Sequence, residues 1–176
     1  MKKFIYLLVI SFFYFGTIKA QDNSFGVIAG FQNVAAEVDG NGLSGYDGSA
    51  GFYVGVFKSF ALVEKLSIQP EILYSHVFQD DESIGMIIVP ALFKYFLSEG
   101  FSIQGGPMLD YTIDSDEHEK ALGISFAVGA AYDFNEKLFL SARYAFGATN
   151  RLDETFYGND FTGRLDLLQI GLGLRL

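Results

Sequence analysis

Cysteine is absent from the 176-residue sequence, and histidine occurs only twice. Without cysteine the chain has no disulfide framework, no thiolate metal site and no cysteine nucleophile. Basic residues are also few: 12 lysines and arginines stand against 21 acids, which gives a formal charge of −9. A generic nucleic-acid-binding protein needs a basic face to meet the phosphates. The composition therefore argues against nucleic acid as a partner.

Long apolar runs are also missing from the body of the sequence. After residue 20 the nearest candidate, residues 84–96, is interrupted by Gly85, Pro90 and Lys94. A membrane-spanning helix needs about 20 consecutive and predominantly apolar residues. No such helix is expected beyond residue 20.

The first twenty residues have the pattern of an export signal. Two lysines precede an apolar run over residues 4–15, and a plausible cleavage site follows at residues 18–20. An uncleaved anchor is the alternative, but the run is short for a membrane span. We expect residues 1–20 to be a cleaved signal peptide and residues 21–176 to form one domain. Loss of three lysines and no acid changes the formal charge from −9 to −12.

Apolar residues in the rest of the chain recur with the period of two that β-strands require. In residues 122–134, bulky side chains such as Phe126 and Val128 alternate with small ones such as Gly123 and Ala127. A tilted strand needs about 9–11 residues to cross a bilayer. Eight segments have this strand character: 24–33, 50–59, 66–77, 84–96, 101–111, 122–134, 138–147 and 165–176.

The connections between these segments differ in length and in charge. The short joins are residues 60–65, 97–100 and 135–137, and the joins on the other side are 34–49, 78–83, 112–121 and 148–164. All of the latter except 78–83 are long, and together the four carry thirteen acids and three bases. Short turns on one rim and long loops on the other are typical of outer-membrane barrels, whose termini face the periplasm. We therefore predict an all-β fold, an eight-stranded antiparallel transmembrane up-and-down β-barrel with acidic extracellular loops.

A soluble β-barrel or sandwich is the competing architecture. Its outer face would carry Lys, Glu, Thr and Arg, whereas the second face of residues 122–134 and 165–176 carries mainly Gly, Ser, Ala and Gln. Small residues suit a narrow interior, and a charge in the middle of a bilayer costs several kcal/mol. We expect the apolar side chains to face lipid and the small ones to crowd the lumen.

Seven short motifs follow one another along nearly all of the chain after residue 20. They are FGVIAG (25–30), LSIQPEILYS (66–75), IIVPALFKY (87–95), QGGP (104–107), GAAY (129–132), SARYAFG (141–147) and QIGLGLRL (169–176). With these motifs the sequence resembles the small outer-membrane β-barrel proteins of Gram-negative bacteria that are often labelled PorT-like or porin-like. The resemblance implies outer-membrane lipid, lipopolysaccharide, the barrel-insertion machinery and other envelope proteins as partners. Leu176 departs from the aromatic last residue of many such barrels.

Charged and amide side chains on the small-residue faces are the candidates for a site. Glu71 and Arg143 each lie five residues past the turn-side start of a strand, which places them at similar depth. Eight strands enclose a space just wide enough for side chains, so the two can meet across it. We predict a polar network in the lumen, either a structural ion pair with amide partners or a gate whose re-pairing opens a pore. Its members are Gln69, Glu71, Gln104, Arg143 and Gln169.

Two further groups of charged residues are expected to meet water. Lys94, Asp110, Asp133 and Arg175 lie nearer the strand ends, at a solvated mouth or rim. Acids cluster in the loops, and hard cations prefer several oxygen ligands. Loose Ca²⁺ or Mg²⁺ binding is one interpretation of this cluster and a solvated acidic rim is the other. The metal candidates are Asp114, Asp116, Glu117 and Glu119, with acids 80–82 close by.

Catalytic residues are not expected. Ser75 and His76 are adjacent on a strand, so they point to opposite faces and cannot act as a pair. No glycine-rich phosphate loop is present, and no cofactor is expected. The sequence favours a structural, adhesion-like or accessory outer-membrane protein without catalytic activity. A narrow pore for ions or small solutes is the alternative, and an outer-membrane lipid-modifying enzyme is the third class.

Overall fold

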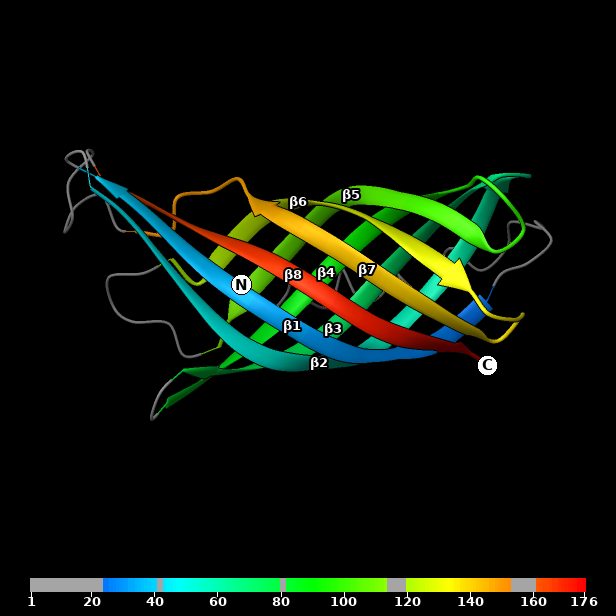
Figure 1. The fold of residues 1–176 in the computed structure, drawn as a ribbon, viewed down its shortest axis with the longest axis horizontal. Coiled ribbons are helices and arrows are strands. Elements are labelled where there is room, and N and C mark those ends of the chain that lie inside the picture. Colours follow the sequence, from blue (N-terminus) through cyan, green and yellow to red (C-terminus); the bar gives the residue numbers. More distant parts are fainter. Residues whose placement is uncertain (1–23, 41–42, 80–81, 114–119, 153–160) are drawn as a thin grey trace, which may run out of the picture.

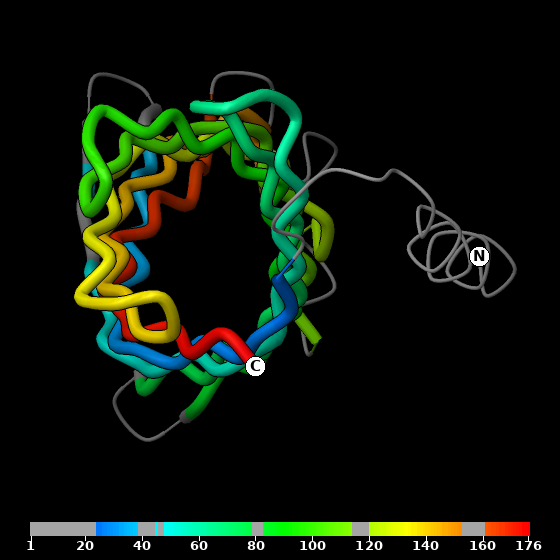
Figure 2. Tube along the Cα trace, turned by 90° about the vertical axis from the view of Figure 1, so that its right-hand side faces the viewer, coloured from blue at the N-terminus to red at the C-terminus, as the bar shows by residue number. Residues whose placement is uncertain are grey.

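The computed structural model describes residues 24–40, 43–79, 82–113, 120–152 and 161–176. Eight antiparallel strands follow one another around a closed barrel, with β8 paired to β1 (Figure 1), and Figure 2 shows the closed ring of strands. The predicted all-β, eight-stranded up-and-down barrel is confirmed. The strands are β1 (Ser24–Gly40), β2 (Leu43–Val63), β3 (Leu66–Gln79), β4 (Glu82–Phe96), β5 (Phe101–Thr112), β6 (Leu122–Asp133), β7 (Leu138–Gly147) and β8 (Phe161–Arg175). Within the described ranges, no helix is long and apolar enough to cross a membrane.

The first hairpin differs from the prediction. The prediction of a long loop over residues 34–49 is wrong. β1 continues to Gly40, β2 begins at Leu43, and the two strands pair without a register shift. Residues 35–50 are rich in glycine and small polar residues, so they lack the alternation that marks a lipid-facing strand. A strand beyond the apolar band needs no apolar face, and backbone pairing with β1 continues along this hairpin. For the same reason β8 begins at Phe161, before the predicted start at residue 165.

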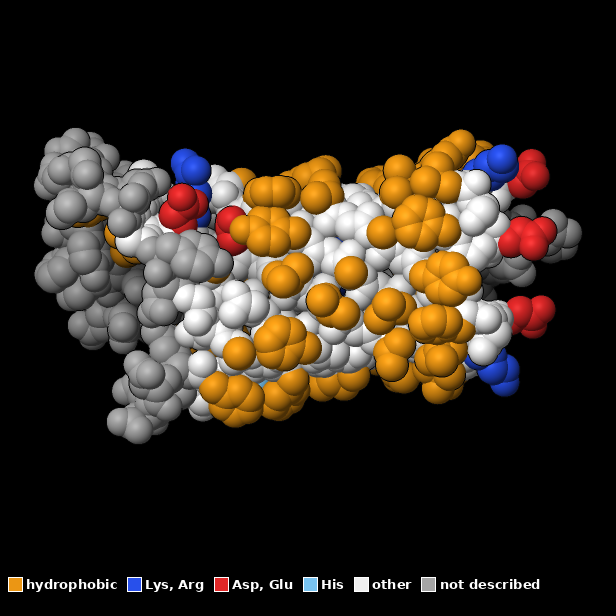
Figure 3. Space-filling view, in the orientation of Figure 1, with side chains coloured by type: hydrophobic (Ala, Val, Ile, Leu, Met, Phe, Trp, Pro, Cys, Tyr) orange, Lys and Arg blue, Asp and Glu red, His pale blue; other side chains and the backbone are white. Residues whose placement is uncertain are grey.

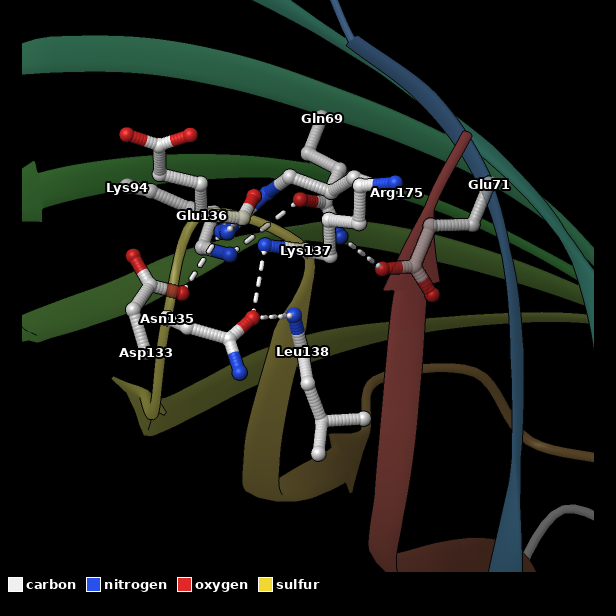
Figure 4. A network of polar contacts seen from close by, with 9 residues as sticks. All are labelled: Gln69, Glu71, Lys94, Asp133, Asn135, Glu136, Lys137, Leu138 and Arg175. Atoms are coloured by element: carbon white, nitrogen blue, oxygen red, sulfur yellow. Dashed lines mark hydrogen bonds and ion pairs between the residues drawn. The ribbon is translucent and has the colours of Figure 1, made fainter.

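The short turns close one rim of the barrel. Between β6 and β7, Asn135 Oδ1 accepts hydrogen bonds from the backbone N–H groups of Lys137 (2.9 Å) and Leu138 (2.8 Å), as Figure 4 shows. The asparagine side chain thus accepts hydrogen bonds from backbone N–H groups of its own turn, which have no partner on a neighbouring strand in the described ranges. This bonding defines where β7 begins.

The outer face of the barrel is apolar along its length and charged at its rims (Figure 3). Large apolar side chains are exposed on every strand; Phe126 is 52% exposed and Val128 is 42% exposed. A soluble monomer rarely exposes a contiguous apolar patch of more than a few hundred Å². A band around the whole barrel is instead suited to acyl chains. Exposed aromatic residues lie near both ends of the strands, as two girdles require: Tyr74 and Tyr111 on the loop side, and Tyr95, Phe101 and Tyr132 on the turn side.

The interior contains more than the small residues that the sequence predicted. Small side chains such as Ala127 and Ala131 do face the lumen from β6, but large apolar ones point inward from the other strands. A lumen lined by glycine and alanine alone would leave voids whose lining atoms lose their dispersion contacts. The larger members of the buried cluster are Ile28, Tyr53, Phe57, Leu73, Met86, Ile88, Leu92, Met108, Phe139 and Leu167.

Glycines on β8 make room for the inward-pointing aromatic rings. A Cβ atom on Gly173 would lie 2.1 Å from Phe139 Cζ, and one on Gly171 would lie 2.2 Å from Tyr53 Oη. Any larger residue at either position would have to displace a buried ring. The small face of β8 therefore reflects close packing against β2 and β7, and not an open channel.

Candidate functional site

An ion pair crosses the lumen between β3 and β7. Arg143 Nη2 lies 2.8 Å from Glu71 Oε2, and the two side chains are 2% and 0% exposed. Beyond this ion pair, Glu71 Oε2 and both Nη atoms of Arg143 make no hydrogen bond with described residues. Charge attraction across the poorly solvated interior holds the pair together. The structure thus brings together the two residues that the sequence placed at the same depth.

Amide and hydroxyl side chains extend this ion pair around the lumen. Arg143 Nε donates to Gln169 Oε1 (2.7 Å), Gln169 Nε2 donates to Gln32 Oε1 (3.0 Å), and Gln32 Nε2 donates to Ser75 Oγ. These hydrogen bonds run from β7 through β8 and β1 to Ser75 on β3. Glu71 also lies on β3, and its ion pair with Arg143 returns to β7. Sequence reasoning missed Gln32 and Ser75. Gln32 lies directly opposite Gln169 in the register of β1 with β8, and the sequence alone does not give this register.

On the other side of the ion pair the network reaches a lysine. Gln69 Nε2 donates to Glu71 Oε1 (2.7 Å), and Lys94 Nζ donates to Gln69 Oε1 (3.1 Å), as Figure 4 shows. Lys94 is 1% exposed, so its predicted place at a solvated rim is wrong. The strand registers place Lys94 between Ser67 on β3 and Gln104 on β5, inside the lumen.

The fifth predicted member of the network makes a separate contact. Gln104 Nε2 donates to Ser141 Oγ on β7 (2.8 Å), and no hydrogen bond or ion pair among the described residues joins this bond to the Glu71–Arg143 pair. The predicted set therefore divides into this single bond and a connected group. The connected group is Gln69, Glu71, Arg143 and Gln169.

A buried phenylalanine fills the turn-side end of the lumen. The centroid of the Phe139 ring lies 4.6 Å from Lys94 Nζ and 4.8 Å from Arg175 Cζ, and the ring packs edge-on against Phe57. Contact with an aromatic face offsets part of the hydration that a buried cation loses. Arg175 also pairs with Asp133 at 2.6 Å, and both side chains are partly exposed, in agreement with a rim position.

A segment of the connection between β7 and β8 is bonded to the loop-side parts of β5 and β8. Arg151 forms an ion pair with Asp110, and its Nη1 donates to the carbonyl oxygen of Lys120 (3.0 Å). The backbone N–H of Arg151 donates to the carbonyl oxygen of Gly163 (2.7 Å), which ties the segment to β8. Asp110 is 3% exposed, so its predicted place at a solvated mouth is wrong. Sequence reasoning assigned Arg151 to a loop and missed its role as the ion-pair partner of Asp110.

The metal-site hypothesis falls on residues that the structure does not describe. The candidates Asp114, Asp116, Glu117 and Glu119 lie outside the described residues, as does the signal peptide predicted for residues 1–20. Within the described part of the chain, no group of three or more His, Cys, Asp or Glu side chains is placed to hold a metal ion.

Ser75 and His76 lie on opposite sides of the barrel wall, as the strand period predicts. Ser75 bonds Gln32 in the lumen, whereas the His76 ring packs against Phe52 (5.4 Å) and Phe78 (5.0 Å) on the outer face. A hydroxyl nucleophile needs its base within hydrogen-bonding reach. This adjacent pair cannot form such a catalytic unit.

A closed barrel of eight antiparallel strands, with an apolar exterior and a buried polar layer inside, defines an outer-membrane β-barrel protein. The comparison with protein families agrees with this class. The chain belongs to the family described as outer membrane protein beta-barrel domain, which it matches over residues 5–175. No curated protein matches the sequence.

Several solved structures have a similar fold. Ail, the attachment invasion locus protein of Yersinia pestis, has a TM-score of 0.56 at 12% identity, with 89% of this chain and 100% of Ail covered. Neisserial surface protein A has a TM-score of 0.53 at 14% identity, with 86% and 97% covered. The outer membrane enzyme PagL has a TM-score of 0.53 at 11% identity, with 82% and 99% covered. At these identities the similarity shows the fold alone. Together with the family, it indicates an outer-membrane location.

Proposed function

We propose that the protein is a non-catalytic outer-membrane barrel with a structural, adhesion-like or accessory role among other envelope proteins. In this proposal the termini and short turns face the periplasm, and the long acidic loops face the outside. Residues 1–20 serve as the signal peptide, and lipid and lipopolysaccharide surround the barrel. Such a role needs a rigid scaffold that presents loops, and it needs no path through the lumen.

The observation that carries the proposal is the filled lumen. Phe139 fills the turn-side end, the Glu71–Arg143 pair and its partners cross the interior, and the Asp110–Arg151 pair is buried toward the loop side. An ion moving along the axis would have to separate these buried pairs. Separation leaves uncompensated charges in a poorly solvated interior, which costs several kcal/mol. Together these layers support a barrel that is closed to small solutes.

Single-channel recording of the full chain in planar bilayers tests this proposal. We expect no steady conductance steps from the natural sequence. The combined variant Glu71→Ala, Arg143→Ala, Lys94→Ala, Phe139→Ala and Arg151→Ala serves as a positive control, because it disrupts all three layers together. Steady conductance from the natural sequence would contradict the closed barrel and favour a pore.

A narrow pore is the second candidate function, and one observation favours it. Glu71 Oε2 and the Nη atoms of Arg143 have unused hydrogen-bonding capacity, which water or a new partner could satisfy. If the pair acts as a gate, Glu71→Gln changes the open probability in the same recordings. A lipid-modifying activity, the third class, is tested by analysis of lipid A after expression of the protein in an outer membrane. Unchanged lipid supports the non-catalytic role.

A further inference from the structure

The β1–β2 hairpin continues beyond the neighbouring pairing of the barrel on the loop side (Figure 1). β2 pairs with β1 from Leu43 onward, but its pairing with β3 begins only at Gly51. In the described part of the chain, residues 43–50 therefore have a partner strand on one side alone. This stretch is as long as an ordinary strand, for which about 5–6 residues is the mean.

The opposite edge of this extension is covered. β1 pairs with β8 as far as Gly40 and Phe161. The segment with Asn150 and Arg151 bonds β8 in turn: Arg151 N–H donates to the carbonyl oxygen of Gly163 (2.7 Å), and Asn150 Oδ1 accepts from Gly163 N–H (2.9 Å). Three paired strands thus extend past the β2–β3 ladder, and among the described residues their unpaired edge is that of β2.

The hydrogen-bond ladder determines which backbone groups face this free edge. The N–H of Leu176 donates to the carbonyl oxygen of Phe25 (2.9 Å), so odd-numbered residues of β1 bond to β8. Even-numbered residues of β1 bond to β2, which makes Gly40 and Leu43 a hydrogen-bonded pair. By the same alternation, the N–H and C=O groups of residues 44, 46, 48 and 50 point away from β1.

This edge lacks lysine, proline and a bulge, which are common blocks to the addition of a strand. Natural edge strands are protected by lysine, proline or a bulge. Residues 43–50 contain neither lysine nor proline, and their register with β1 has no shift. The outer part of the hairpin, residues 33–50, carries Glu37, Asp39 and Asp47 and no basic residue. The edge therefore offers backbone hydrogen bonds in acidic surroundings.

We propose that residues 43–50 of β2 form a strand-addition site for an extended, lysine- or arginine-bearing segment of a partner protein. The segment lies antiparallel to β2 and bonds the backbone of residues 44, 46, 48 and 50, while the net negative charge of the hairpin attracts its cations. This inference rests on the proposed interaction role, for which it names the surface and the chemistry of the partner.

A second copy in the same membrane does not fit this edge. In a symmetric dimer the two copies are related by a two-fold axis along the membrane normal. This rotation leaves the β2 strands of both copies pointing to the same side of the membrane. The two edges would then cross and could not run antiparallel. A separate extended segment has no such restriction.

Hydrogen exchange tests the proposal on the full chain folded in lipid nanodiscs. The probe is the synthetic peptide KVTVKVTVK, and its control has glutamate in place of each lysine. Followed by NMR, the amides of residues 44, 46, 48 and 50 should exchange rapidly alone and roughly tenfold more slowly with the lysine peptide. Amides in residues 66–77 serve as the internal reference and should not change. The glutamate peptide should give no slowing.

A pair of variants at one position separates strand addition from general attraction. Gly48→Pro removes an outward N–H without touching the bonds to β1, and proline is tolerated on such an edge. Gly48→Ala keeps that N–H. We expect the proline variant to bind the lysine peptide roughly tenfold more weakly, about the contribution of one hydrogen bond, and the alanine variant to bind normally. Equal heat-modifiable gel migration of both variants verifies their folding.

Several results would overturn the inference. Slow exchange at residues 44–50 without peptide would show an edge already covered by this chain, or by a second copy if the slowing grows with protein concentration. Equal protection by both peptides would refute the preference for a cationic partner. Equal binding by both Gly48 variants would refute strand addition. None of these results affects the bilayer recordings, which test the proposed function separately.

Discussion

Glu71→Gln removes the negative partner of a buried arginine while preserving the shape of the side chain. Arg143 would then keep its Nε bond to Gln169 and its contact with the Tyr53 ring, 5.9 Å from Cζ to the centroid. Breaking a buried ion pair by removing one partner costs about 3–5 kcal/mol, because a charge remains uncompensated. Glu71 is 0% exposed, so bulk water does not replace the lost carboxylate. We therefore expect a loss of about 3–5 kcal/mol in the free energy of unfolding.

Urea titration of the protein in lipid vesicles measures this loss. Tryptophan is absent, so the readout is far-UV circular dichroism with heat-modifiable gel migration. The double variant Glu71→Gln with Arg143→Met should recover most of the lost stability, because no unpaired charge remains. Glu136→Gln, at an exposed turn position, is the matched control and should change stability by less than about 0.5 kcal/mol. A loss below about 1 kcal/mol, or no recovery in the double variant, would refute the reasoning.

Three further changes test other parts of the barrel. Gly173→Ala places a methyl group against the Phe139 ring and should lower the free energy of unfolding by about 1–3 kcal/mol in the same urea titration. Its control, Gly45→Ala, places a methyl group in open space and should leave stability unchanged. Val128→Arg puts a charge on the lipid face near the middle of β6 and should cost about 2–4 kcal/mol, with a cost near zero arguing against a membrane-embedded face. Arg151→Ala strips Asp110 of its partner and should destabilise the barrel, yet bilayer recordings should still show no conductance because the inner layers remain. New conductance in Arg151→Ala would mean that the Asp110–Arg151 pair alone closes the lumen.

Sequence alone was sufficient for the barrel and for the side of each strand that faces lipid. A strand that crosses a bilayer must expose an apolar side chain at every second position, and this requirement is local, so Phe126 and Val128 display it directly. The outer part of the β1–β2 hairpin escaped prediction because no bilayer acts on it there. Glu71 and Arg143 were also within reach of sequence, since equal distance from a turn implies equal depth in a barrel.

Only the tertiary structure decided what fills the lumen. The Gln32–Gln169 contact joins residues 137 positions apart, and it depends on the register in which β8 closes against β1. Lys94 lies near a strand end by sequence, but the lumen places Phe139 and Gln69 against it and removes it from water. Periodicity assigns a residue to a face of the sheet, whereas its contacts and burial follow from how all eight strands close around the axis.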